Sequence, residues 1–300
     1  MYTILYIGVH HYKNDSKWRS ETFINNAFNN NNIKTVRIDY RSILKEKNQK
    51  YLQSIIEEKS KKCDLLFLQR GENLNPVIFM NVKIPMIFWS TEPIQLKNDV
   101  DLLLKDRIFS WIFVHSYSCL DRIKIDFPHI TIKCSVLHNA LPKEKINFNI
   151  IPKKYFAIFN RNLSLRRKWW LYQNYKDIKI IKGVYGDQYY ANLSESEIAV
   201  NIHFSSKNKD DFETGIFEAL ARKCLVISEK LNPKVINDLD LNGVIIEVGN
   251  PRELKQKLKY LKNNPKIIAE FQNKSKEAIK KNTWDYRILT IKEKIEEILS

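Results

Sequence analysis

The chain has 300 residues, a formal net charge of +16 and a pI near 9.5, and 44% of its residues are hydrophobic. This length is enough for two medium domains with complete cores, and the composition is typical of a globular protein. No apolar run in this sequence approaches the roughly 20 residues of a membrane-spanning helix.

In the first half of the chain, short apolar runs alternate with patterns typical of amphipathic helices. No basic leader precedes the first run, so we expect it to be a strand and not a signal peptide. The expected strands are Thr3–Val9, Lys34–Asp39, Asp64–Gln69, Met86–Trp89, Trp111–His115 and Cys134–His138. Helical patterns lie near residues 21–29, 48–61 and 118–126. This alternation predicts one doubly wound α/β domain with a parallel sheet over residues 1–150.

A second series of the same kind follows a polar stretch from Pro142 to Pro152, which we interpret as a linker. Its expected strands are Tyr155–Asn160, Ile178–Val184, Ile198–His203, Cys224–Ser228 and Val244–Val248, with a helix over Ser164–Tyr175. It predicts a second domain over residues 151–284. Apolar residues continue at helical spacing through Ile291, Ile295 and Leu299, so residues 285–300 are expected to form an amphipathic final helix.

The segment from Asp210 to Glu229 is the most informative part of the second domain. Asp210 with Glu213 three residues later is a capping-box pattern, and it precedes a short helix whose apolar residues share one face. Glu218 lies one turn beyond Thr214, so both side chains can line a site above the helix N-terminus, where an anion is favoured. The alternative is an ordinary surface helix with an exposed glutamate.

This segment, DFETGIFEALARKCLVIS, resembles the C-terminal signature of retaining GT-B glycosyltransferases of the group 1 type, particularly their CgeB-like branch. The resemblance implies two Rossmann-like domains facing a cleft, with the last helix crossing back to the first domain. It also implies that Glu218 holds the ribose of a nucleotide-sugar and that Asp210, a catalytic candidate, faces the sugar. Gly215 and Lys223 depart from the Arg and Gly that are common in this family.

Further landmarks of the family appear in order along the second domain. Tyr185-Gly186 resembles the turn near the nucleobase, and the run from Asn201 to Ser205 resembles a strand end near the diphosphate. Arginines that follow the first strand of this domain can offer forked contacts to phosphate; solvent exposure is the alternative reading of each. The expected donor-binding residues are Glu218, Arg161, Arg166, Tyr185, Gly186, His203, Ser205, Thr214 and Gly215.

Polar residues also end the strands of the first domain, where ligands of open α/β sheets bind. Glu92 follows the strand ending at Trp89 and resembles the family's acid beside the reacting sugar; its alternative role is the start of a turn before Pro93. His115 is a second catalytic candidate, although a histidine at a strand end is more often structural. The acceptor-side candidates are Gly8, His10, His11, His138 and Asn139.

The four cysteines, Cys63, Cys119, Cys134 and Cys224, are widely spaced and are expected to be reduced thiols, because disulfide scaffolds and zinc sites use other spacings. The absence of a leader and of paired acids at an expected metal loop predicts a cytoplasmic enzyme without metal or other cofactor. It would use a UDP- or GDP-linked sugar as substrate.

The basic charge is compatible with several kinds of binding partner. The acceptor could be a glycan, a lipid-linked glycan, a protein or modified DNA, and a peripheral contact with an anionic inner membrane face is compatible with the charge. Two other functions stay open: a nucleic-acid-directed glycosyltransferase or binder, and an inactive GT-B scaffold.

Overall fold

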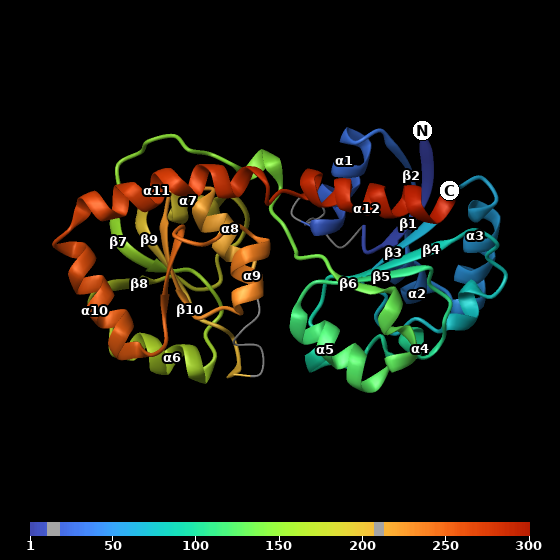
Figure 1. The fold of residues 1–300 in the computed structure, drawn as a ribbon, viewed down its shortest axis with the longest axis horizontal. Helices are drawn as coiled ribbons and strands as arrows, with labels where there is room; N and C mark the ends of the chain where they lie inside the picture. Colours follow the sequence, from blue (N-terminus) through green and yellow to red (C-terminus); the bar gives the residue numbers. More distant parts are fainter. Residues whose placement is uncertain (11–18, 207–212) are drawn as a thin grey trace. The chain divides into compact units, whose positions relative to one another are not determined.

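A computed structural model of the chain describes residues 1–10, 19–206 and 213–300. These residues form two compact units. Unit 1 comprises Met1–Asn139 together with Trp284–Ser300, and unit 2 comprises Ala140–Thr283. Each unit is built on one parallel β-sheet with helices on its faces, which confirms the predicted fold class (Figure 1).

The sheet of unit 1 has six parallel strands in the order β2-β1-β3-β4-β5-β6. They are β1 (Tyr2–Gly8), β2 (Ile33–Asp39), β3 (Leu65–Gln69), β4 (Met86–Ser90), β5 (Trp111–Val114) and β6 (Cys134–Val136). Every residue of β3 and β4 is buried, which explains why both sequences are continuous apolar runs without alternation. All six predicted strands are present, with ends shifted by only one or two residues.

The helices of unit 1 are α1 (Ser20–Asn30), α2 (Tyr40–Glu46), α3 (Gln49–Ser60), α4 (Asp101–Lys105), α5 (Tyr117–Asp126) and α12 (Trp284–Leu299). The final helix, α12, is integrated into this unit. The Trp284 ring packs edge-on against Trp89 with centroids 5.6 Å apart, and Asp285 Oδ1 accepts a hydrogen bond from Asn30 Nδ2 at 2.7 Å. The chain therefore leaves unit 1 after Asn139 and returns to it at Trp284.

The sheet of unit 2 has five parallel strands in the order β11-β10-β9-β7-β8. They are β7 (Tyr155–Phe159), β8 (Ile178–Ile180), β9 (Ser196–Asn201), β10 (Leu225–Glu229) and β11 (Ile245–Val248). The helices are α6 (Leu165–Tyr172), α7 (Gly186–Ser194), α8 (Gly215–Leu220), α9 (Pro233–Asp238), α10 (Pro251–Lys262) and α11 (Pro265–Lys280). A core of aliphatic and aromatic side chains from β7, β9, β10, α6 and α10 fills the space on one side of the sheet.

Two details differ from the sequence interpretation. The stretch interpreted as a linker is bonded to unit 2, because Asn147 N donates to Ala221 O at 2.9 Å; the residue before the stretch, Leu141, also donates from its N to Asn282 O at 3.1 Å. Unit 2 therefore begins at Ala140, before that stretch. The pair Tyr185-Gly186 does not close a strand: β8 ends at Ile180, and Gly186 is the first residue of α7, with a φ of +65° that suits glycine.

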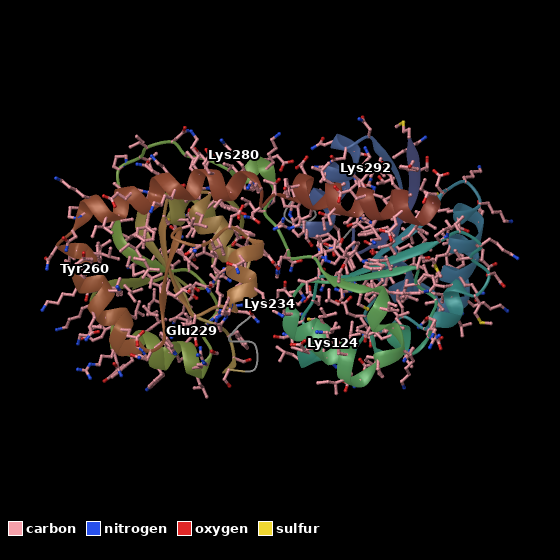
Figure 2. The ribbon with its side chains drawn as sticks, viewed as in Figure 1. Lys124, Glu229, Lys234, Tyr260, Lys280 and Lys292 are labelled. Atoms are coloured by element: carbon pink, nitrogen blue, oxygen red, sulfur yellow. The ribbon has the colours of Figure 1, made fainter. Side chains whose placement is uncertain are left out.

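The surface of both units carries the basic charge that the composition indicates. Exposed lysines extend from helices of each unit, for example Lys124 on α5 and Lys280 on α11 (Figure 2). None of the four cysteines forms a disulfide. Among the helices in the described part of the chain, none combines the length and the apolar character needed to cross a membrane.

Candidate functional site

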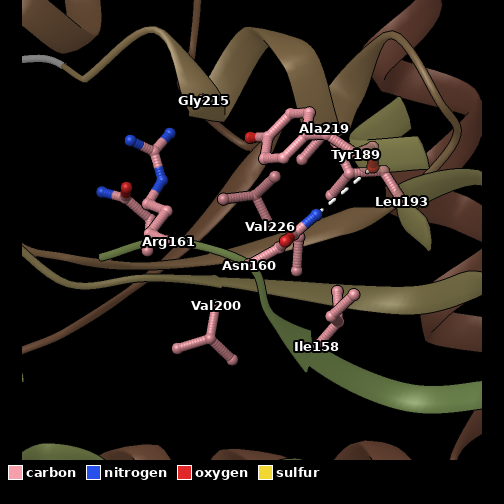
Figure 3. A pocket seen from close by; sticks show the side chains of 11 residues that line it. Ile158, Asn160, Arg161, Tyr189, Leu193, Val200, Gly215, Ala219 and Val226 are labelled. Carbon is pink, nitrogen blue, oxygen red and sulfur yellow. Dashed lines mark hydrogen bonds between the residues drawn. The ribbon is translucent and has the colours of Figure 1, made fainter. Parts of the chain in front are cut away.

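In unit 2, the Arg161 side chain follows the carboxyl end of β7 and lies over the first residue of α8. A Cβ atom added to Gly215 would lie 1.1 Å from Arg161 Nη2, so the guanidinium occupies the space that any side chain at position 215 would need. Figure 3 shows the guanidinium pointing toward Gly215. Glycine is thus required at this position for Arg161 to keep its place.

Glu213 holds this arginine together with a second one. Glu213 Oε2 accepts from Arg161 Nη1 at 3.0 Å and from Arg167 Nη2 at 2.8 Å, and Oε1 accepts from the Phe204 backbone N–H at 3.2 Å. Because α8 begins at Gly215, Glu213 precedes the helix and does not act as the predicted capping-box residue. The N-cap of α8 is Thr214, which makes no side-chain cap bond, and Asp210 lies outside the described residues.

One nitrogen of Arg161 has no hydrogen-bond partner among the described residues. Nη2 is buried and makes no hydrogen bond, although Nη1 is paired with Glu213. The guanidinium borders a small pocket beside α8. This pocket is lined by Ile158, Asn160, Arg161, Tyr189, Leu193, Ala199, Val200, Asn201, Gly215, Ala219 and Val226 (Figure 3). An unpaired buried donor is costly, so Nη2 is a ready position for an acceptor atom of a ligand.

Glu218 is oriented by two tyrosines of α7. Its Oε2 accepts from the Tyr189 hydroxyl at 2.8 Å, and its Oε1 accepts from the Tyr190 hydroxyl at 3.4 Å. Burial, and then the Glu218 charge, raise the pKa of Tyr189 well above its ordinary value, so this hydroxyl keeps its proton. A carboxylate has about four lone-pair positions, and Glu218 can therefore accept from further hydroxyls.

Arg166 is paired with a different carboxylate from the one that binds Arg161. Its guanidinium forms a forked pair with Glu229 at the end of β10, with Nη1 to Oε2 at 2.7 Å and Nη2 bonded to Oε1 (Figure 2 labels Glu229). Arg166 Nη1 also donates to the His203 carbonyl at 3.1 Å. The His203 ring is fully buried, and its Nδ1 lies 3.9 Å from Glu213 Oε1. Arg166 therefore ties α6 to the ends of β9 and β10, whereas Arg161 presents a buried nitrogen without a hydrogen-bond partner.

Four other predicted donor residues lie at the start of α7, at the start of α8 or after β9. Tyr185 is exposed and donates weakly to Asn162 Oδ1 at 3.4 Å, while Gly186 begins α7. Thr214 directly precedes Gly215, and its carbonyl accepts from Glu218 N at 3.1 Å. Ser205 follows the buried His203 by two residues and is half-buried.

In unit 1, Arg70 follows β3 and forms ion pairs with three glutamates. Its Nη2 lies 3.0 Å from Glu92 Oε1 and 3.0 Å from Glu72 Oε1, and its Nη1 lies 3.7 Å from Glu21 Oε1. The backbone of Arg70 has a φ of +73°, a left-handed conformation uncommon outside glycine. Burial opposes the charge on Arg70, but Glu92 and Glu72 outweigh it and raise the guanidinium pKa.

The three glutamates of this group differ in their surroundings. Burial raises the pKa of Glu21, which is 1% exposed, and Arg70 offsets only part of that effect. Burial alone would also raise the pKa of Glu72, but Arg70 and the Tyr40 hydroxyl, 2.5 Å from Oε2, outweigh it and lower that pKa. Glu92 is 32% exposed and is the member of the group most open to solvent.

The remaining acceptor-side candidates border the same edge of the sheet. Gly8 ends β1, and a Cβ there would lie 3.4 Å from Glu21 Cγ and 3.5 Å from His10 Nε2. His138 Nδ1 lies 3.1 Å from the His115 carbonyl, and Asn139 Nδ2 donates to the Thr91 carbonyl at 3.1 Å. His11 lies outside the described residues.

His115 is enclosed in this edge. Burial, and then the neighbouring His138, lower its pKa to about 4, while backbone groups of Ser90 and Glu92 oppose that shift. Its imidazole is therefore neutral near pH 7 and can accept or donate a hydrogen bond without carrying charge.

The sequence interpretation missed Glu213, Tyr189 and Arg70 as site residues. Glu213 was assigned a local capping role, whereas its arginine partners lie 46 and 52 residues away along the chain. For Tyr189 and Arg70 no local pattern gives a signal, because their carboxylate partners come from other elements. Within the described residues, no three His, Cys, Asp or Glu side chains are grouped so that they could hold a metal ion.

Comparisons with known proteins place the chain in a family. A family model described as glycosyl transferase-like matches residues 135–293. No curated protein matches the sequence. Among solved structures, a glycosyltransferase from Rickettsia africae ESF-5 is 14% identical with a TM-score of 0.67, and the match covers 100% of this chain and 99% of that one.

Two further structures of similar size share the fold. Anabaena HepE in complex with UDP-glucose is 11% identical with a TM-score of 0.65, covering 100% of this chain and 99% of that one. The sucrose-phosphate synthase of Thermosynechococcus elongatus is 10% identical with a TM-score of 0.64, covering 99% of both chains. These likenesses show a GT-B fold of two Rossmann-like units. Because the family model matches more than half of the chain, the protein belongs to the glycosyl transferase-like family.

Proposed function

We propose that the protein transfers a sugar from a nucleotide diphosphate donor, UDP- or GDP-linked, to a hydroxyl acceptor. The observation that carries this proposal is the Arg161 guanidinium, which lies over Gly215 and whose buried Nη2 makes no hydrogen bond. It stands at the carboxyl end of a parallel sheet, where ligands of such sheets bind. Anabaena HepE, which shares the fold, was solved with UDP-glucose and with UDP.

The donor contacts follow from the chemistry of each side chain in unit 2. Arg161 Nη2 would donate to a diphosphate oxygen, and Glu218 would accept from the ribose hydroxyls beside the two tyrosine hydroxyls that it already binds. His203, Ser205 and Thr214 would lie near the diphosphate, and Tyr185 with Gly186 near the base. Asp210 is assigned to the sugar by the family resemblance alone.

In the proposed reaction, the bond between the anomeric carbon and the diphosphate oxygen breaks, and the electron pair stays on that oxygen. The acceptor oxygen forms a new bond to the anomeric carbon, and its proton passes to the leaving diphosphate or to a carboxylate. We propose retention of configuration and membership of the CgeB-like branch, both from the resemblance of the segment containing Glu218. The Arg161 cation would stabilise the charge that develops on the diphosphate.

Glu92 is the proposed carboxylate for the acceptor. It is the most exposed member of the Arg70 group, and Arg70 holds its Oε1 at 3.0 Å. A carboxylate held by one oxygen can accept the proton of an acceptor hydroxyl with the other. His115, buried and neutral, would orient the group through the backbone of Glu92.

A ligand screen tests the donor assignment. The protein is mixed with UDP-glucose, other UDP-sugars, GDP-mannose and, as a control, ADP-ribose, and its thermal unfolding is followed. A ligand that binds only the native state raises the midpoint, by several degrees at saturating concentration. We expect a rise with at least one UDP- or GDP-sugar and its loss in Arg161→Ala. No rise with any of these sugars would contradict the proposal.

Metal independence is a separate expectation. Because a guanidinium is assigned to the diphosphate, transfer should continue at its full rate in excess EDTA. If turnover vanishes with EDTA and returns with manganese or magnesium, the assignment of diphosphate stabilisation to Arg161 is wrong.

A second candidate function is an inactive scaffold that binds the donor without turnover. It is favoured by the ion pairs of Arg161 with Glu213 and Arg166 with Glu229, which already neutralise cations expected at a phosphate. Saturable donor binding with neither transfer nor donor hydrolysis would support this candidate.

A further inference from the structure

Helix α6 of unit 2 presents a row of large apolar side chains to solvent. The exposed fractions are 84% for Leu165, 58% for Trp169 and 78% for Tyr172. Their spacing places these three residues on one side of the helix, and Tyr175, 62% exposed, continues the row just beyond it. Soluble proteins seldom expose such side chains together, so this side of α6 is suited to contact another surface.

The opposite side of α6 packs the helix against the core of unit 2. Trp170 and Leu171 are buried in the core of unit 2, and the buried Arg167 binds Glu213. The exposed row is therefore not needed to hold α6 in place. Its removal should leave the fold intact, which makes the row accessible to a clean test.

Lysines lie beside the row. Lys168 on α6 is exposed, and so is Lys176, whose Nζ lies 6.0 Å from the centroid of the Tyr175 ring. Between residues 163 and 186 the only acidic residue is Asp177, and Lys262 Nζ lies 3.4 Å from its Oδ1. Helix α6 and the turn after it thus combine exposed apolar and aromatic side chains with a net positive charge in this stretch of the chain.

We propose that this α6 surface, made of the four apolar residues with Lys168 and Lys176, docks the protein on an anionic lipid bilayer. Tryptophan and tyrosine favour the headgroup region, leucine favours the acyl boundary, and lysines are attracted to acidic headgroups. The inference does not depend on the proposed transfer reaction.

Other occupants fit the surface less well. A symmetric contact with a second copy would bring the same lysines together, and their charges would repel. Single-stranded nucleic acid binds through aromatic stacking in a positive groove, whereas the most exposed residue of this row, Leu165, is aliphatic and stands on a convex helix.

Sedimentation with vesicles tests the proposal on the full chain. We expect binding to vesicles of phosphatidylcholine with about 30% phosphatidylglycerol, little binding to phosphatidylcholine alone, and weaker binding at high salt. The double variant Leu165→Ser with Trp169→Ser should lower the partition coefficient at least about tenfold. Tyr51→Ser, which removes an aromatic side chain 48% exposed on α3, is the matched control and should bind like the parent.

Two further measurements keep the test decisive. Thermal unfolding of the double variant should match that of the parent, and tryptophan fluorescence should shift to shorter wavelength on anionic vesicles only when Trp169 is present. Equal vesicle binding by the double variant, or no binding to anionic vesicles at low salt, would overturn the proposal. So would a dimer or a tight DNA complex that is lost in the double variant while vesicle binding stays unchanged.

Discussion

The two units each hold a cluster of charged side chains near the carboxyl end of the sheet, with opposite ratios of carboxylates to arginines. In unit 1 the Arg70 guanidinium is shared by the carboxylates of Glu21, Glu72 and Glu92. In unit 2 the Glu213 carboxylate is shared by Arg161 and Arg167. After pairing, unit 1 retains carboxylate oxygens and unit 2 retains an N–H donor. In the proposed reaction, the Arg70 group of unit 1 would accept a hydrogen bond from the acceptor hydroxyl, and Arg161 of unit 2 would donate one to phosphate.

The largest expected effect concerns the buried imidazole of unit 1. The pKa of His115 falls from an ordinary 6.5 to about 4 in the folded state. Between these values the unfolded chain binds more protons, so the free energy of unfolding decreases as pH falls from 6.5 to 4, by about 3 kcal/mol in total. Denaturant unfolding of parent and His115→Gln at pH 6.5 and 4.5 measures it.

The variant should lose most of this pH dependence. His129→Gln, at an exposed position, is the control and should keep it. If parent and His115→Gln have the same slope of unfolding free energy against pH, His115 is not held neutral by burial.

Glu92→Gln tests the acceptor role of unit 1. The substitution keeps the shape of the side chain and removes the charge that faces Arg70, so turnover should fall roughly a hundredfold while donor affinity stays nearly unchanged. Kinetics with saturating donor, together with calorimetric donor titration, separate these two quantities. Turnover within about threefold of the parent would assign Glu92 to the turn before Pro93, as the alternative reading of the sequence has it.

Glu218→Gln tests the donor role of unit 2. A charge-assisted bond to a ribose hydroxyl contributes roughly 1.5 to 3 kcal/mol, so donor affinity should fall about ten- to hundredfold in calorimetry. Glu270→Gln, at an exposed position of α11, is the matched control. Unchanged donor affinity in Glu218→Gln would remove this residue from the site.

Gly215→Ala tests whether the position of Arg161 depends on the absence of a side chain at residue 215. The new Cβ would displace the guanidinium, and donor affinity should fall about tenfold, which corresponds to about 1.4 kcal/mol. In the Arg161→Ala background the same change should cost little, because the clash is gone. The control is Gly249→Ala, whose Cβ would meet its nearest atom at 3.4 Å. If the losses of donor affinity in the two single variants add up in the double variant, the position of Arg161 does not depend on Gly215.

The central strands were predictable because they are buried on both faces. Continuous apolar runs such as Leu65–Gln69 mark buried parallel strands clearly, and the predicted ends are off by one or two residues there. Helix α7 was missed because it begins at Gly186 and carries few apolar residues, so its pattern is weak. Short helices such as α4 give too few residues for a period to be recognised.

The candidate site was predictable only in part. The strand-end rule and the family resemblance pointed to Arg161, Glu218 and Glu92; the structure places Arg161 after β7, Glu92 after β4 and Glu218 on α8. The partners that decide their protonation and direction are non-local: Glu213 for Arg161, Tyr189 for Glu218, and Arg70 for Glu92. Such contacts depend on tertiary packing, which spacing along the chain does not encode.

Hydrogen exchange with and without a saturating UDP- or GDP-sugar tests the central claim most directly. We expect the donor to protect backbone amides of residues 159–167 and 213–221 in unit 2, with Arg161→Ala reducing that protection at equal donor concentration. Protection confined to unit 1, or tight donor binding that leaves both segments of unit 2 unchanged, would contradict the account.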